Sequence, residues 1–225
     1  MKNKKLSVII RARNEERWIG HTIQSVLDFI SFPEIIVINN KSNDRTVEIA
    51  KNFQSDPELA NNNAYTEIKI VDIDEYSPGK AINYGTNLAS HEYVLLISGH
   101  CVLKEFKFEQ HIQDLEDYAA IFGNQIPVWQ GKKIKKRYLW SHFGEEKVIN
   151  MYSDMEGRRF LHNAACLYKK ETLINYPFDE NLTGKEDRYW ANKMIDDNKK
   201  NILYDPSIVV DHHYTENGNT WKGIG

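Results

Sequence analysis

Leu6-Ser7-Val8-Ile9-Ile10 is an apolar run that changes abruptly into the polar segment Arg11-Ala12-Arg13-Asn14-Glu15-Glu16. The same change recurs where Ile35-Ile36-Val37-Ile38 meets Asn39-Asn40-Lys41-Ser42, and where Tyr93-Val94-Leu95-Leu96-Ile97 meets Ser98-Gly99-His100. Short runs rich in Val and Ile, without alternation, predict strands buried on both faces, as in a parallel sheet. Ligands of open α/β sheets bind beyond the carboxyl ends of the strands, so these three polar tips predict a ligand site.

Helical patterns separate the strand-like runs. A helix with one buried face is predicted from apolar residues at helical spacing, namely Ile19, Ile23, Val26, Leu27 and Ile30. A second helix is expected over 46–53, with Asp44 as its N-terminal cap. A strand is expected over 68–73, and a third helix over 81–89. This alternation argues for βαβ units with right-handed crossovers.

The pattern changes from Glu105 onward. Helices are expected over 105–118 and 186–195, and strands over 119–123, 163–168 and 208–210. A length of 225 residues fits one large α/β domain, or one domain with a small appended subdomain.

Composition excludes several classes of protein. A net charge of −3 gives no reason to expect nucleic acid as a partner. No stretch has the length of a transmembrane helix, and the first residues lead into a strand rather than a signal peptide, which predicts a soluble or peripheral protein. Cys101 and Cys166 lie beside apolar sequence, and a reducing cytosol without a disulfide is the simpler interpretation.

The strand tips carry neither Gly-x-Gly-x-x-Gly nor Gly-Lys-Ser/Thr, so the sheet is not predicted to hold a dinucleotide or to form a P-loop. The segments 6–19, 35–46, 79–100 and 164–213 instead occur in the order and spacing of family 2 glycosyltransferases of the GT-A fold. The resemblance rests on four motifs, Asn39-Asn40-Lys41-Ser42-Asn43-Asp44-Arg45-Thr46, Gly79-Lys80-Ala81-Ile82-Asn83-Tyr84-Gly85, Phe178-Asp179-Glu180 with Glu186-Asp187, and Val209-Val210-Asp211-His212.

This resemblance implies an α/β fold of GT-A (Rossmann-like) type, a mostly parallel sheet flanked by helices with a mixed C-terminal half. Residues 1–104 would form the nucleotide-sugar-binding half, and residues 105–225 the acceptor-side and catalytic half of the same domain. The implied reaction is inverting transfer of a sugar from a nucleotide-sugar to a hydroxyl acceptor, a glycan or a lipid-linked molecule. The expected setting is bacterial capsule, lipopolysaccharide or lipooligosaccharide synthesis, in the cytoplasm or at the inner face of the membrane.

Two other functions remain as alternatives. A sugar nucleotidyltransferase would normally carry a Gly-rich loop after the first strand, whereas residues 11–16 contain no glycine. A catalytically silent nucleotide-sugar-binding module is the other, because the chain lacks the family's Asp-x-Asp.

In place of Asp-x-Asp after the fourth strand, where the family holds a divalent metal, this chain has Ser98-Gly99-His100. Mg²⁺ prefers oxygen ligands, so an imidazole ligand favours Mn²⁺ or a softer ion. His100 is therefore predicted as one metal ligand and His212 as the second, with Asp211 or His213 in reserve. Alternatively His100 contacts the diphosphate without a metal, or only caps a strand.

The base of the donor is also open. The family commonly has Asp where this chain has Asn39, and an amide can pair with uracil, thymine or cytosine. A UDP-sugar is favoured, with CDP- or dTDP-sugars as alternatives. The residues expected to contact the donor are Arg11, Ala12, Arg13, Glu15, Asn39, Asn40, Lys80, Asn83, Ser98, Gly99 and His100. For the basic residues among them, an ordinary surface role is the alternative.

Asp187 is the predicted general base, with Glu186 supporting it, because inverting transfer needs a carboxylate that takes the proton of the acceptor hydroxyl. The alternative is that both carboxylates only stabilise the N-terminus of a helix.

Five of the six residues in the run Lys132–Arg137 are basic, and aromatic residues flank it at Trp129, Tyr138, Trp140 and Phe143. Such a composition suits an anionic membrane surface or a charged lipid-linked acceptor. A solvated loop face is the alternative.

Overall fold

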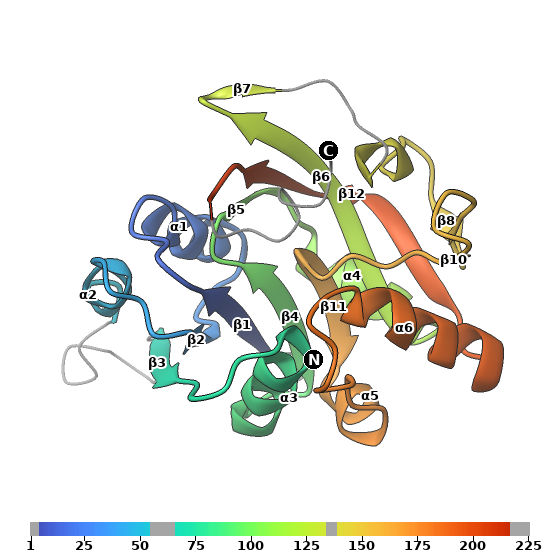
Figure 1. Ribbon diagram of the computed structural model, residues 1–225, viewed down its shortest axis with the longest axis horizontal. Helices are drawn as coiled ribbons and strands as arrows, with labels where there is room; N and C mark the ends of the chain where they lie inside the picture. Colours follow the sequence, from blue (N-terminus) through green and yellow to red (C-terminus); the bar gives the residue numbers. More distant parts are fainter. Residues whose placement is uncertain (1–4, 55–65, 134–138, 217–225) are drawn as a thin grey trace.

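The computed structural model describes residues 5–54, 66–133 and 139–216. They build one large sheet with helices on both faces (Figure 1), in the strand order β3, β2, β1, β4, β11, β6, β12, β5, with β7 added to β6 and β8 added to β12. The strands are β1 Leu6–Ala12, β2 Glu34–Asn39, β3 Glu67–Asp72, β4 Tyr93–Ser98, β5 Cys101–Glu105, β6 Ala120–Trp129, β7 Lys132–Lys133, β8 Val148–Ile149, β11 Ala165–Lys169 and β12 Ile202–His213. A separate small hairpin joins β9 Tyr152–Ser153 and β10 Arg158–Arg159.

The helices are α1 Ile19–Phe29, α2 Thr46–Lys51, α3 Pro78–Leu88, α4 Phe108–Asp114, α5 Lys170–Asn175 and α6 Glu186–Asn192. None of the helices within the described ranges is long and apolar enough to cross a membrane.

The first four strands of the sheet are parallel, with β1 between β2 and β4. Their side chains alternate between two cores because successive residues of a strand point to opposite faces. Val8 and Ile10 pack in the same core as Ile23 of α1, whereas Ile9 packs in the core that contains Ile82 of α3. The prediction of strands buried on both faces is confirmed.

The second half of the sheet is mixed. β11 runs antiparallel to both β4 and β6, whereas β12 runs parallel to β6 and antiparallel to β5. The predicted fold class, a mostly parallel α/β sheet with a mixed C-terminal half, is therefore confirmed.

Element boundaries differ from the prediction mainly in this half. The helix expected from Glu105 begins only at Phe108, because Cys101 and Leu103 are buried on one face of an additional strand, β5. β12 begins at Ile202, well before the predicted 208–210, because a register shift between Asp205 and Val209 interrupts the apolar pattern. β6 likewise continues past 123, as far as Trp129.

The N-terminal ends of α3 and α6 also have local causes. α3 begins earlier than expected because the Ser77 side chain accepts a hydrogen bond from the Lys80 amide and Pro78 occupies the first turn. Lys185, directly before α6, has a left-handed backbone with φ of 60°. After Asn192 the predicted helix continues as a π-helical segment over Lys193–Asp197.

α3 is fixed against the loop that precedes α6. A Cβ on Gly79 would lie 2.4 Å from the Asp179 carbonyl oxygen, so only glycine permits this approach. The Asn83 amide donates to the Phe178 carbonyl at 2.9 Å and accepts from the Phe178 amide at 3.0 Å. The two halves of the chain are thereby held together beside the sheet.

Glu34, at the start of β2, is a buried carboxylate with a complete set of partners. It accepts hydrogen bonds from the Lys69 ammonium at 2.7 Å and from the Ser90 amide at 2.7 Å, and the Ser7 hydroxyl also donates to it. Although burial raises the pKa of Glu34, these hydrogen bonds bring it down to about 2. The carboxylate therefore stabilises the fold when it is ionised.

We expect Glu34→Gln to lower the free energy of unfolding at pH 7 by about 2 kcal/mol. Because the folded pKa lies below the unfolded one, this stabilisation is complete above pH 4.5 and is lost as the pH falls towards 2. Urea unfolding of the wild type and the variant at pH 7 and pH 3 measures it. A difference that is as large at pH 3 as at pH 7 would contradict the electrostatic explanation.

Candidate active site

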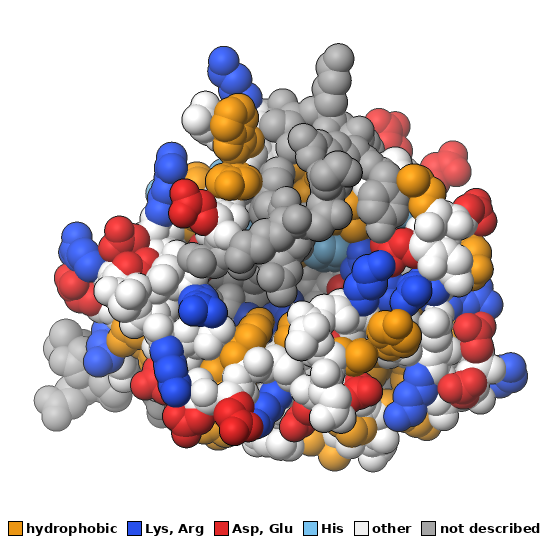
Figure 2. All heavy atoms as spheres, viewed as in Figure 1, with side chains coloured by type: hydrophobic (Ala, Val, Ile, Leu, Met, Phe, Trp, Pro, Cys, Tyr) orange, Lys and Arg blue, Asp and Glu red, His pale blue; other side chains and the backbone are white. Residues whose placement is uncertain are grey.

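The three polar tips lie together at one edge of the sheet, as predicted. Arg11 of β1 is in register with Ser98 of β4, and Ala12 is in register with Asn39 of β2. The Gly99 amide donates to the Arg11 carbonyl at 3.0 Å. In the space-filling view, a hollow on this face has His and Lys or Arg side chains at its border (Figure 2).

His100 and His212, the two predicted metal ligands, contact each other directly. Their Nε2 atoms are 3.1 Å apart, and both side chains are buried. The contact follows from the sheet, because His212 of β12 is in register with Cys101 of β5, directly after His100. The His100 Nδ1 lies 2.9 Å from a carboxylate oxygen of Glu15 on the tip of β1.

The contacts continue from His212 towards the second half of the site. The His212 Nδ1 lies 2.9 Å from the Gln125 Oε1, and the Gln125 Nε2 lies 2.9 Å from the His162 Nδ1. Five buried side chains thus form one hydrogen-bonded row, which we call the histidine row: Glu15, His100, His212, Gln125 and His162.

The centre of this row fits a divalent metal. Ligand atoms of His100, Cys101 and His212 all lie within 4.8 Å of one another. Burial and the neighbouring His100 lower the pKa of His212 well below its ordinary value, so its imidazole is neutral, as a metal ligand must be. Glu15 holds the far nitrogen of His100 and Gln125 that of His212, which is the usual outer support of metal-bound histidines. Burial raises the pKa of the Cys101 thiol well above its ordinary value, so Cys101 is the weakest of the three donors.

Both cysteines, Cys101 and Cys166, are unpaired and buried.

Glu186 and Asp187 begin α6 and are both buried. Asp187 accepts a hydrogen bond from the Arg188 guanidinium at 2.8 Å, and Glu186 pairs with the Arg11 guanidinium at 3.3 Å. Each carboxylate therefore has its own arginine, one of them from the tip of β1.

The environment drives the pKa values of the two carboxylates apart. Burial, with the charge of Asp187, raises the pKa of Glu186 to about 7, against the effect of Arg11. Burial also raises the pKa of Asp187, but Arg188, His162 and the Asn163 amide together bring it below its ordinary value. Asp187 is therefore ionised at neutral pH, whereas Glu186 titrates near it.

Residues 161–163 are held between these charged groups. The Arg188 guanidinium donates to the Leu161 carbonyl at 2.8 Å, and the Asn163 amide donates to the Asp187 carboxylate at 3.3 Å. Arg11 donates to the Asn163 carbonyl at 3.2 Å. His162 is thereby placed beside Asp187.

The remaining predicted donor contacts have varied surroundings. Ala12 is buried, Asn40 is half-buried with its amide donating to the Ala12 carbonyl at 2.9 Å, and Arg13 is exposed. Lys80 pairs with Glu75 at 3.0 Å. The Asn83 amide bonds to the loop before α6, as described above, so this side chain joins the two halves of the protein.

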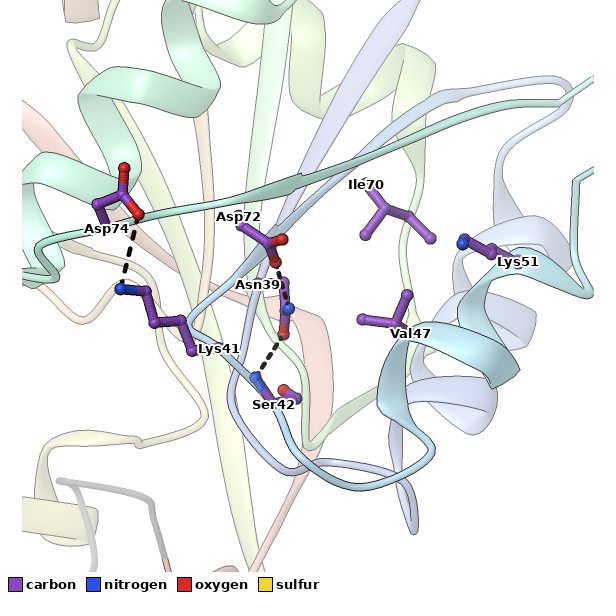
Figure 3. A pocket seen from close by; sticks show the side chains of 8 residues that line it. All are labelled: Asn39, Lys41, Ser42, Val47, Lys51, Ile70, Asp72 and Asp74. Atoms are coloured by element: carbon purple, nitrogen blue, oxygen red, sulfur yellow. Dashed lines mark hydrogen bonds and ion pairs between the residues drawn. The ribbon is translucent and has the colours of Figure 1, made fainter.

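Asn39 borders a cavity of about 520 Å³ between β2, β3 and α2 (Figure 3). Its Oδ1 accepts from the Ser42 amide at 3.1 Å, and its Nδ2 donates to the Asp72 carboxylate at 2.5 Å. Both ends of the predicted base-reading amide are therefore bonded within the protein.

Of the run Lys132–Arg137, residues 134–137 lie outside the described residues, as does Tyr138. Lys132 and Trp129 are exposed. Trp140 and Phe143, expected beside the run as surface aromatics, are fully buried in the core instead. The proposed surface therefore lacks two of its four aromatic residues.

Sequence reasoning missed four residues of the site: Gln125, His162, Asn163 and Arg188. One available indication was the pair His162-Asn163 directly before the apolar run 164–168, a polar tip at the start rather than the end of a strand. Gln125 had none, because it lies in a part of β6 that was not predicted.

Comparisons with known proteins identify the family of this chain. The family described as Glycosyl transferase family 2 matches residues 7–176. The GalNAc(5)-diNAcBac-PP-undecaprenol beta-1,3-glucosyltransferase of Campylobacter jejuni is 29% identical over 193 residues, which cover 84% of this chain and 59% of that protein. The poly-beta-1,6-N-acetyl-D-glucosamine synthase of Staphylococcus epidermidis is 33% identical over 53% of this chain and 28% of its own length. The match thus covers 59% of the length of the first of these relatives and 28% of the length of the second.

Solved structures show the same fold. TarS of S. aureus in complex with UDP-GlcNAc superposes with a TM-score of 0.68 at 17% identity, over 95% of this chain and 60% of that one. GalNAc-T7 with UDP, GalNAc and Mn²⁺ gives a TM-score of 0.70 at 14% identity, over 95% of this chain and 45% of that one. With a parallel sheet whose polar tips meet a buried carboxylate pair, and a family match over most of its length, the chain belongs to glycosyltransferase family 2.

Proposed function

We propose that this glycosyltransferase moves a sugar from a nucleotide-sugar to an acceptor hydroxyl with inversion. The observation that carries the proposal is the 3.3 Å contact between Arg11 and Glu186. It brings the start of α6, with its carboxylates, to the strand tips where ligands of such sheets bind. The anomeric carbon of a donor held at the strand tips would then have the carboxylates of α6 on the side opposite its leaving diphosphate.

In this proposal residues 1–104 hold the donor and residues 105–225 hold the acceptor and the catalytic base. The donor is a UDP-sugar, with CDP- or dTDP-sugars as alternatives, and the TarS and GalNAc-T7 structures that share the fold contain UDP-GlcNAc or UDP. The Asn39 side-chain amide is bonded to Asp72 and to the Ser42 backbone amide. We therefore assign Asn39 the role of orienting the Asp72 carboxylate beside the nucleobase of the donor.

Asp187 acts as the base. The acceptor oxygen forms a bond to the anomeric carbon while the bond from that carbon to the diphosphate breaks. The proton of the hydroxyl passes to Asp187, and the electron pair leaves with the diphosphate. Asp187 is ionised at neutral pH and so can take the proton, while Glu186 fixes Arg11 at the junction of the two halves.

His100 and His212 would hold a divalent ion, with Mn²⁺ favoured over Mg²⁺ because both donors are nitrogens. When bound, such an ion supplies positive charge for the leaving diphosphate. Glu15 and Gln125 keep the two Nε2 atoms directed at one point.

The setting we propose is bacterial surface-polysaccharide or lipid-linked glycan synthesis, in the cytoplasm. The similar undecaprenol-linked glucosyltransferase of Campylobacter jejuni and the poly-beta-1,6-N-acetyl-D-glucosamine synthase of Staphylococcus epidermidis support the type of synthesis. The run Lys132–Arg137 would meet an anionic membrane surface or acceptor. A silent nucleotide-sugar-binding module and a sugar nucleotidyltransferase are the alternatives that the following experiments separate.

Asp187→Asn should lower kcat for the turnover of the best UDP-sugar by about 10²- to 10⁴-fold, because the variant has no base. The dissociation constant of UDP should stay within about twofold, since Asp187 is not assigned to the donor nucleotide. Asp179→Asn, an exposed carboxylate of the neighbouring loop, is the matched control and should keep wild-type turnover. Wild-type turnover in the Asp187 variant would remove it as the base, and an inactive wild type that still binds UDP would favour the silent module.

Glu186→Gln should change the dependence of stability on pH. Because the folded pKa of Glu186 is raised to about 7, the wild type loses stability between pH 4.5 and 7 as the carboxyl must ionise in a buried place. The variant has no such titration, so its free energy of unfolding relative to wild type should rise by about 2 kcal/mol between pH 5 and pH 8. Denaturant unfolding at both pH values measures this, and a constant difference would refute the raised pKa.

Calorimetry of UDP, CDP, dTDP and GDP with Mn²⁺ and with EDTA tests the metal. We expect UDP to bind selectively, at least tenfold more weakly in EDTA, and His212→Gln to remove this difference between Mn²⁺ and EDTA. Selective binding that is indifferent to EDTA would make the histidines a direct phosphate contact. The absence of binding by all four diphosphates would refute a nucleoside-diphosphate donor.

A further inference from the structure

The structure fixes which nitrogen of His162 carries a proton. The Ala164 amide donates to the His162 Nδ1 at 3.3 Å, so this nitrogen presents a lone pair. The Gln125 Nε2 donates to the same atom at 2.9 Å, which leaves the Gln125 Oε1 to accept from the His212 Nδ1. A backbone amide thus orients the side chains of the histidine row at this end.

The ring of His162 is also neutral. Burial and the neighbouring Arg188 lower the pKa of His162 to about 3, so the imidazole carries one proton in the physiological range. With the lone pair on Nδ1, that proton is on Nε2. His162 is therefore an uncharged hydrogen-bond donor with a fixed tautomer.

This donor has no protein partner among the residues that the structure describes. All of the hydrogen bonds that His162 makes there are to Nδ1, whereas its Nε2–H meets no acceptor of residues 5–54, 66–133 or 139–216. The His162 Nε2 is not one of the fully buried polar atoms that lack a partner, so it is accessible from outside the protein, and a ligand that enters the site can offer it an oxygen.

The position of His162 indicates which part of the substrate its Nε2–H would contact. Its ring centroid lies 6.0 Å from that of His212, at the end of the site assigned to the leaving diphosphate. Its backbone neighbours Leu161 and Asn163 are bonded to Arg188 and Asp187, at the end assigned to the base. In an inverting displacement the transferred sugar must lie between these two ends.

We propose that the His162 Nε2–H donates a hydrogen bond to a hydroxyl or carbonyl oxygen of the transferred sugar. This inference rests on the proposed function and adds the residue that holds the sugar of the donor. Gln125 is its positioning residue, because it holds the tautomer without touching the sugar.

The test compares wild type with His162→Phe, His162→Asn and His162→Gln, using hydrolysis of UDP-glucose, UDP-galactose, UDP-GlcNAc and UDP-GalNAc as the probe. We expect His162→Phe and His162→Asn to lower kcat/KM for the best UDP-sugar about tenfold, the value of one neutral hydrogen bond. The dissociation constant of UDP should change less than twofold. His162→Gln should recover at least half of the loss, because a Gln amide nitrogen reaches the place of the ring Nε2.

The outcomes separate this inference from the proposed function. If the wild type neither binds UDP nor turns over any of the four UDP-sugars, the UDP-sugar donor fails, and this inference fails with it. If the wild type is active and His162→Phe, folded by its thermal melt, has the same kcat/KM, only the inference about His162 is overturned. An equal weakening of UDP and UDP-sugar binding would also overturn it, because the contact would then be to the nucleotide.

The tautomer has a readout that does not depend on turnover. Nitrogen NMR of the labelled wild type should show the proton of His162 on Nε2, and Gln125→Leu should shift the ring towards a mixture of tautomers. The same Gln125→Leu variant should lower kcat/KM. A proton on Nδ1 in the wild type would refute the inference.

Discussion

The antiparallel pairing of β11 with β4 is the constraint on which the site depends. Because the two strands run in opposite directions, the start of β11 lies beside the carboxyl end of β4, with Ala165 opposite Ile97. The Ser98 amide donates to the Ala164 carbonyl at 3.2 Å and closes this end of the ladder. A parallel strand at this place would have put residues 161–164 at the opposite edge, far from the polar tips.

The same argument explains the meeting of His100 and His212. β12 is parallel to β6 and antiparallel to β5, so the end of β12 lies beside the beginning of β5, and the His213 amide donates to the His100 carbonyl at 3.0 Å. One sheet therefore brings together strand tips from β1 and β4, the start of β11 and the end of β12. Only the first two of these follow from a simple parallel sheet.

The parallel part of the sheet could be predicted from the sequence, whereas the mixed part could not. Continuous apolar runs predicted β1, β2 and β4, and a parallel sheet then predicts that Arg11 and His100 share an edge. The role of Gln125 and His162 could not be predicted in this way, because it depends on strand order and direction in the mixed half. There the pairing is long-range, β12 carries a bulge, and the polar residues of β6 and β12 hide the strand pattern.

The charged groups of the site have separate roles in the proposed reaction. Arg11 and Arg188 are each bonded to a buried carboxylate, Glu186 and Asp187 respectively, and removing either partner would leave an uncompensated buried ion. These arginines are therefore already engaged before any substrate enters. A diphosphate that leaves the donor needs positive charge of its own, and in the proposed reaction that charge must come from the opposite end of the site. The converging nitrogens of His100 and His212 meet this need, because they can bind a cation there without disturbing the carboxylate that takes the proton.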